Sequence, residues 1–254
     1  AKANRLALQA GYNYAITVEL FHERYHVPQA KMPSGEYRQI TGNQAVAMGC
    51  VAASVQSGLS LFYASYPITP ASDILHLLAQ YRDFGIKTIQ SEDEIAAVSA
   101  AIGASFGGSL GVTGTSGPGL DLKGEALGYA VMVELPLVVL NIQRGGPSTG
   151  LPTKTEQTDL LTAIHGRHGE APIPVLAPST PGESFYMVLE AFRVALKYMT
   201  PVILLSDGAL ANGAEPWKLP DLDSLPDLRL RFRTDPKGFT PCSRNPTTFV
   251  RDWA

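Results

Sequence analysis

Short apolar segments alternate with longer helical patterns through most of this 254-residue chain, and this alternation restricts the fold more than any other feature. Segments 135–144 and 201–207 contain apolar runs without polar alternation, which is typical of strands buried on both faces. The stretches between such segments have helical patterns of about 10 to 17 residues. The sequence therefore predicts βαβ units, that is, an α/β fold with a mainly parallel sheet.

Composition divides the chain into three parts. Residues 1–40 begin with a helical pattern and continue as a polar stretch interrupted by Pro and Gly, which predicts a leading helix and a linker. Residues 41–214 contain the alternating segments and form the predicted domain. Residues 215–254 are rich in Pro and Asp, and we expect them to form an extended tail.

The bulk composition excludes several classes of protein. With 45% hydrophobic residues, 17% charged residues and a net charge of −3, the chain has neither a membrane-spanning run nor a basic stripe. We therefore expect no membrane or nucleic-acid partner. Cys50 and Cys242 form neither a disulfide framework nor a CxxC spacing. The sequence predicts a cytoplasmic protein that has no metal site or iron–sulfur motif of its own.

Polar and glycine-rich residues collect where the predicted strands end. In a parallel sheet the carboxyl ends of the strands share one edge, and ligands bind there. The segments that follow the strands are YPITPAS, QSEDE, TGTSGPG, QRGGPSTGLPT and LSDGALA.

The loop 114–123, GTSGPGLDLK, is the most glycine-rich of these segments. Leu120 occupies the position where a phosphate-binding P-loop requires Lys, so that motif is absent. Two interpretations remain: a tight turn from strand to helix, or a direct phosphate contact. Asp121, Lys123 and Glu125 are expected to form the solvated first turn of the following helix.

Three acids precede a helix rich in Ala and Gly that ends near residue 108, and its small residues predict a buried helix. Ser91 followed three positions later by Glu94 matches a capping box. Glu92 and Asp93 would then complement the helix dipole. From the local pattern Glu94 is either a capping residue or a chemically active carboxylate.

Arg144 ends a predicted buried strand at the ligand edge. A guanidinium in that position can bind a carboxylate through two parallel hydrogen bonds. The alternative is an ion pair with an acid at the rim of the domain.

Taken together and in order, the segments at the strand ends resemble those of a known family. The combination of YPITP, EIAAVSAAIGAS, SGPG and RGGPSTGLPT is similar to the α subunit of 2-oxoacid:ferredoxin oxidoreductases, and to the 2-oxoglutarate type more than the pyruvate type. The resemblance covers residues 36–215. It implies a three-layer α/β/α thiamine diphosphate-binding fold, in the module that binds the cofactor's aminopyrimidine.

The resemblance also implies a reaction and a set of partners. A 2-oxoacid, with 2-oxoglutarate preferred and pyruvate or a branched 2-oxoacid as alternatives, would react with coenzyme A to give acyl-CoA, CO₂ and reduced ferredoxin, or the reverse. Thiamine diphosphate would be shared with a β subunit that carries Mg²⁺ and an iron–sulfur cluster. We expect activity only with that subunit, in a dimer of heterodimers. A non-catalytic scaffold subunit is the alternative from a different class.

Family site residues transfer to single positions of this sequence. Glu94, preferred to Glu92, matches the glutamate that hydrogen-bonds the pyrimidine ring nitrogen. The segment YPIT implies cofactor contacts at Tyr66, Pro67, Ile68 and Thr69. The implied substrate-binding residues are Thr69, Arg144, Ser148, Thr149 and Lys154.

The flanking parts have family counterparts as well. Residues 1–40 are similar to the end of the γ-type domain that precedes α in some members. Residues 215–254 are expected to lead to a further domain that this sequence does not include. The resemblance thus suggests an excerpt of a fused γ–α polypeptide.

Overall fold

The computed structural model describes residues 1–20, 23 and 25–253. Residues 21, 22 and 24 of the predicted leading segment, and residue 254 of the predicted tail, lie outside the described residues. The chain divides into two compact units, Ala1–Gly35 and Glu36–Ala254.

The first unit is built around one helix, α1 (Lys2–Thr17), in which no residue is buried. The predicted leading helix is therefore present. The described residues between this helix and residue 35 are largely without regular structure. In the described part of the chain, no helix combines the length and apolar character that crossing a membrane requires.

The second unit contains a six-stranded sheet with the order β3-β2-β4-β5-β7-β6, in which every pairing is parallel. The strands are β2 (Leu61–Ser65), β3 (Ile86–Gln90), β4 (Leu110–Thr115), β5 (Leu137–Gln143), β6 (Val175–Leu176) and β7 (Pro201–Asp207). The two longest strands, β5 and β7, pair from Leu137 opposite Pro201 to Gln143 opposite Asp207. This arrangement confirms the predicted parallel sheet.

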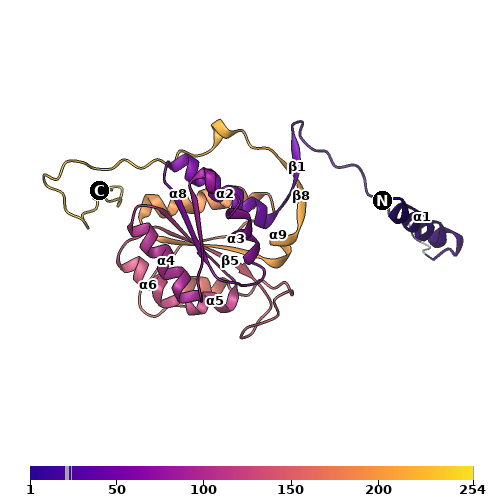
Figure 1. Cartoon of the computed structure of the whole chain (residues 1–254), viewed down its shortest axis with the longest axis horizontal. Helices are drawn as coiled ribbons and strands as arrows, with labels where there is room; N and C mark the ends of the chain where they lie inside the picture. The colour runs from indigo at the N-terminus through magenta and orange to yellow at the C-terminus, as the bar shows by residue number, and fades with distance from the viewer. Residues whose placement is uncertain (21–22, 24, 254) are drawn as a thin grey trace. The chain divides into compact units, whose positions relative to one another are not determined.

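Helices cover both faces of the sheet (Figure 1). Along β5, Val138, Leu140 and Ile142 belong to one hydrophobic core, whereas Leu137 and Val139 belong to the other. The central strands therefore bury both of their faces, which explains their apolar runs, whereas the edge strand β3 has exposed side chains at Lys87, Ile89 and Gln90. The helices of the first face are α2 (Gly42–Ser57), α3 (Ser72–Leu78) and α8 (Glu183–Tyr198), and those of the second are α4 (Glu94–Phe106), α5 (Gly117–Leu122), α6 (Gly124–Met132) and α7 (Leu160–His165).

Two of the helical patterns between the strand segments, residues 70–85 and 119–134, are divided in the structure. The pattern at 70–85 becomes α3 and a separate 3₁₀ turn, Arg82–Phe84. The pattern at 119–134 becomes α5 and α6, which meet at Lys123. The prediction that α4 is buried was wrong for one face, because Ile95 is 55% exposed and Phe106 is 82% exposed.

A small antiparallel sheet joins the two ends of the domain, and sequence analysis did not predict it. Strand β1 (Tyr37–Thr41) pairs with β8 (Ala214–Lys218), and β8 follows the short helix α9 (Gly208–Asn212). The ring of Trp217 is buried in the first core. The predicted linker 1–40 and tail 215–254 therefore each contribute a strand to the domain.

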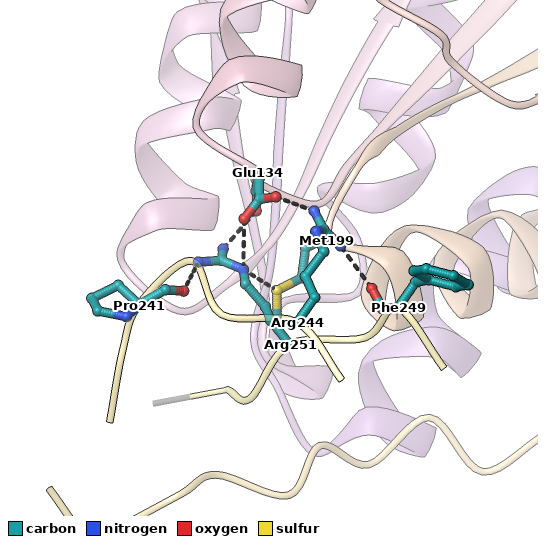
Figure 2. Close-up of polar contacts among 6 residues, drawn as sticks. All are labelled: Glu134, Met199, Pro241, Arg244, Phe249 and Arg251. Atoms are coloured by element: carbon teal, nitrogen blue, oxygen red, sulfur yellow. Dashed lines mark hydrogen bonds and ion pairs between the residues drawn. The ribbon is translucent and has the colours of Figure 1, made fainter. Parts of the chain in front are cut away.

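The C-terminal segment returns to the domain at the amino-terminal edge of the sheet (Figure 2). Arg244 and Arg251 both pair with the carboxylate of Glu134, which precedes β5, and the Arg251 Nε lies 3.1 Å from it. Arg251 also donates to the Glu134 carbonyl at 3.0 Å and contacts the sulfur of Met199. Figure 2 also shows how the carbonyls of Pro241 and Phe249 accept from the same two guanidinium groups.

Gly111 of β4 allows α4 to pack closely on the sheet, and its replacement tests that contact. A Cβ at Gly111 would overlap the carbonyl oxygen of Ala101 and lie 3.2 Å from the Ser105 Cβ. We expect Gly111→Ala to lower the free energy of unfolding by about 1–3 kcal/mol, because α4 must move away. Chemical denaturation of the chain measures the change.

Gly103 of α4 is the matched control. A Cβ at Gly103 meets no atom within 4 Å. Gly103→Ala should raise the free energy of unfolding by about 0.5–1 kcal/mol through helix propensity alone. Equal effects of the two substitutions would contradict the close packing at Gly111.

Candidate active site

Buried polar side chains gather at the carboxyl edge of the sheet, in a domain whose two cores are otherwise apolar. They lie at or just after the ends of β2, β4, β5 and β7. Polar groups buried in this way require partners, and several point to a common edge. The set comprises Ser65, Tyr66, Thr115, Ser116, Asn141, Gln143, Arg144, Ser206 and Asp207.

Asp93, not Ser91, caps the start of α4. The Asp93 side chain accepts a hydrogen bond from the Ala96 backbone N–H at 2.7 Å. Glu94 is the first residue of the helix, so it is not at the third position that a capping box requires. The predicted Ser91–Glu94 capping box is therefore wrong, and the Glu94 carboxylate is free of a capping role. Glu92 is exposed.

Glu94 faces a buried pair of hydroxyl groups. The Tyr66 hydroxyl and Thr115 Oγ1 lie 2.9 Å apart. Burial raises the pKa of the Tyr66 hydroxyl, the Thr115 hydrogen bond opposes this, and the adjacent Glu94 carboxylate raises the pKa further. A Cβ at Gly119 would overlap both hydroxyl oxygens and lie 3.0 Å from the Glu94 Cγ. Glycine at 119 thus leaves the space in which these three side chains meet.

Lys123 is the fourth member of this cluster and contacts the first turn of α4. Its side chain is fully buried, and Nζ donates to the Glu94 carbonyl at 2.8 Å. Nζ also lies 5.0 Å from the centroid of the Tyr66 ring. Burial lowers the pKa of Lys123 to about 8, although the carboxylates of Glu94 and Asp93 oppose this.

The prediction that Lys123 is part of a solvated turn was wrong. Lys123 follows Leu120 by three positions and precedes Leu127 by four, and both leucines are buried. Helical spacing alone therefore places Lys123 on the buried face. The sequence contained this signal, but the charge of the side chain obscured it.

Arg144 joins two loops at the sheet edge. Its Nη1 donates to the Thr69 carbonyl at 2.7 Å, and its Nη2 donates to the Thr149 carbonyl. The predicted alternative, an ion pair with a rim acid, is not formed within the described residues. The buried Arg144 Nε has no partner. The guanidinium therefore keeps donor capacity for a further acceptor.

The predicted substrate-side residues lie on one ordered loop. The Gly145 N–H donates to the Lys154 carbonyl at 2.8 Å, which closes the loop 145–154. The side chains of Ser148, Thr149 and Lys154 are exposed. Arg144 is hydrogen-bonded both to this loop and to the loop that carries Thr69. Its positive charge acts to lower the pKa of the Tyr66 hydroxyl.

The YPIT segment is divided between the site and the core. Tyr66 is buried in the cluster, whereas Pro67 and Thr69 are exposed. Ile68 packs partly against the first hydrophobic core. Of the four predicted cofactor-binding residues in this segment, Tyr66 is the one that contacts the Glu94 cluster.

A second polar network at the same edge was not predicted. Asn141 donates to the Asp159 carboxylate at 2.9 Å, and the Asp159 backbone N–H donates to the Gln143 side chain at 3.0 Å. Burial raises the pKa of Asp159, the Asn141 hydrogen bond opposes this, and two nearby acids add to it. In the described part of the chain, no three acidic, His or Cys side chains are grouped to ligate a metal.

Comparison with known proteins identifies the family. The sequence profile described as pyruvate flavodoxin/ferredoxin oxidoreductase, thiamine diphosphate-binding, matches residues 52–251. This chain belongs to that family. The resemblance and the thiamine diphosphate-binding fold predicted from the sequence are therefore confirmed.

Individual relatives carry 2-oxoglutarate names. The chain is 56% identical over its whole length to the 2-oxoglutarate oxidoreductase subunit KorA of Mycobacterium tuberculosis. It is 44% identical over 199 residues to the 2-oxoglutarate synthase subunit KorA of Archaeoglobus fulgidus, a match that covers 78% of this chain.

A solved structure of the 2-oxoglutarate:ferredoxin oxidoreductase from Magnetococcus marinus, with 2-oxoglutarate, coenzyme A and succinyl-CoA bound, is similar over all of this chain. The TM-score is 0.82 at 33% identity. This chain spans 44% of that chain, 39% of the Mycobacterium relative and 56% of the Archaeoglobus relative.

The cap of α4 can be tested directly. Asp93→Ala removes the bond to the Ala96 N–H, and we expect the free energy of unfolding to fall by about 1 kcal/mol. Ser91→Ala should change it by less than about 0.5 kcal/mol, since its hydroxyl does not cap the helix. Thermal and denaturant unfolding of both variants would contradict this assignment if Ser91→Ala were the more damaging.

The burial of Asp159 predicts a pH dependence of stability. Because its pKa in the folded protein lies above the ordinary value of 3.8, the folded state binds more protons there, and stability is lost as pH rises from 3.8 through the raised pKa. Asp159→Asn should remove this loss and make the chain more stable at neutral pH. Unfolding between pH 3 and pH 7 measures the slope, with the exposed Asp83→Asn as a charge control. An unchanged slope in Asp159→Asn would contradict the prediction.

Proposed function

We propose that this chain is the pyrimidine-binding part of the α subunit of a thiamine diphosphate-dependent 2-oxoacid:ferredoxin oxidoreductase, with 2-oxoglutarate as substrate. One observation supports this most directly. In a domain of the thiamine diphosphate-binding family, the Glu94 carboxylate does not cap its helix. It faces a buried pair of hydroxyl groups at the ligand edge of the sheet.

The residues at this edge fit an aminopyrimidine. Such a ring offers a basic nitrogen, which suits a carboxylate that can accept and return a proton. Gly119 lets Tyr66 and Thr115 approach Glu94, because a Cβ there would overlap both hydroxyl oxygens. When bound, thiamine diphosphate supplies the electron sink that permits a 2-oxoacid to lose CO₂.

In this proposal Glu94 binds and moves a proton at the pyrimidine ring nitrogen. The Tyr66 hydroxyl is protonated at neutral pH and can donate to the Glu94 carboxylate, which raises the pKa of that hydroxyl. Thr115 in turn fixes the Tyr66 hydroxyl at 2.9 Å. The carboxylate is therefore oriented on one side by protein and is free on the other to meet the ring.

Arg144 binds the carboxylate of the substrate. The hydrogen bonds to the Thr69 and Thr149 carbonyls hold the guanidinium at the ligand edge, and its positive charge and unpartnered Nε suit an anionic ligand. Thr69, Ser148 and Thr149 add exposed hydroxyl groups around it. 2-Oxoglutarate has a second carboxylate, and the exposed ammonium of Lys154 on the same loop is its proposed partner.

The proposal includes a β subunit against the exposed face of α4 and α6. Phe106 and Met132 are 82% and 81% exposed on this face, and a surface cavity of about 560 Å³ lies between the two helices. Exposed apolar patches of this kind are typical of protein interfaces. The β subunit would carry the diphosphate site, Mg²⁺ and the iron–sulfur cluster. Coenzyme A, ferredoxin and a dimer of heterodimers complete the proposed enzyme, of class EC 1.2.7, active only when assembled.

The test is turnover by the complex reconstituted from the full α polypeptide and its β subunit. With 2-oxoglutarate and coenzyme A, the complex should release CO₂ and reduce a viologen dye. Glu94→Gln should lower turnover by about 10²- to 10⁴-fold, because the proton relay is lost, with an unchanged melting temperature. A panel with pyruvate and branched 2-oxoacids ranks the substrates.

Glu92→Gln is the matched control, since Glu92 is exposed two residues away and should leave turnover intact. A complex that releases no CO₂ from any member of the panel would exclude the proposed function. Full turnover in Glu94→Gln would instead exclude its catalytic role and favour a scaffold role for this edge.

A further inference from the structure

Lys123 is the only fully buried lysine among the described residues. The ammonium has three donors, and the structure gives it one hydrogen bond, to a backbone carbonyl. Burying a charge is costly unless it is fully paired, and an apolar side chain of similar length often fills such a place without loss of stability. The position of Lys123 therefore calls for an explanation other than packing.

The location of Lys123 is fixed by the backbone on both sides. It is the single residue between α5 and α6, so its Cα lies at the junction of the two helices. From there the side chain reaches the Glu94 carbonyl in the first turn of α4 and the ring of Tyr66 after β2. One side chain thus connects three separate segments that meet at the Glu94 cluster.

Three groups face the Lys123 ammonium from the elements packed against it. They are the carboxylates of Glu94 and Asp93 at the start of α4, and the ring of Tyr66. Both carboxylates attract the ammonium. The attraction is mutual, so Lys123 also draws the first turn of α4 toward α5.

We propose that Lys123 is a positioning residue, which fixes the first turn of α4 and thereby aims the Glu94 carboxylate beside Tyr66. It acts through Glu94 and does not touch substrate. This inference rests on the proposed function, because it assigns Glu94 the proton-transfer role. It gives Lys123 a role that depends on its charge, and neither the family resemblance nor any motif indicated that role.

A titration of the lysine itself tests the contact without any turnover. In the 254-residue chain, NMR of the Lys123 ε-methylene group should show a midpoint near pH 8. In Glu94→Gln the attraction of one carboxylate is lost, so the midpoint should fall, on the order of one pH unit. A midpoint that does not move in Glu94→Gln would overturn the proposed coupling.

Turnover of the assembled complex gives the second measurement. Lys123→Met should lower kcat by about 10- to 100-fold at pH 7, because the Glu94 carboxylate is misplaced, with little change in KM. The melting temperature should be equal or higher, since a buried charge has been removed. In the wild-type complex we expect kcat to decline above about pH 8, as Lys123 loses its proton. This decline should be absent in Lys123→Met and should move to higher pH in Lys123→Arg.

Lys218→Met, at an exposed position on β8, is the matched control and should leave the pH profile unchanged. If Lys123→Met keeps wild-type kcat and the same profile, the positioning role is overturned while the proposed function stands. If the wild-type complex lacks turnover, the proposed function fails. The NMR titration then still decides whether Lys123 and Glu94 are coupled.

Discussion

The rest of this structure depends on a parallel sheet that is buried on both faces. Because the central strands β2, β4, β5 and β7 bury their two faces in apolar cores, most polar groups are left to the edges. At the carboxyl edge the strand ends bring Tyr66, Glu94 and Arg144 toward one place. The chemistry of the chain is therefore a consequence of how the sheet is covered, and the loops supply the particular side chains.

Backbone carbonyls organise this edge as much as side chains do. Arg144 donates to the carbonyls of Thr69 and Thr149, and Lys123 donates to that of Glu94. In each case a buried cation fixes a loop or a helix start. Contacts of this kind leave no signature in the sequence, since any residue provides a carbonyl. They nevertheless determine where the neighbouring side chains point.

The fold was largely predictable, because strand patterns and helix spacing are local properties of the sequence. The family resemblance likewise selected Glu94 and Arg144, which the structure places at the carboxyl edge of the sheet, and their roles stay predictions. The cap of α4 was not predicted correctly, since Ser91 and Asp93 are both good capping residues and only the backbone decides between them. The β1–β8 sheet was also missed, because it pairs segments far apart in the chain, and such pairing depends on the assembled domain.

That small sheet has a consequence for the two ends of the α/β core. Tyr37 lies opposite Lys218, so the first strand of the second unit is held beside the strand from which the C-terminal segment departs toward Glu134. Residues 42–213, which carry the whole parallel sheet and the candidate site, therefore form a loop whose two ends are hydrogen-bonded to each other. Fraying of either end must first break these main-chain bonds, so the two-stranded sheet protects both ends of the core against local unfolding.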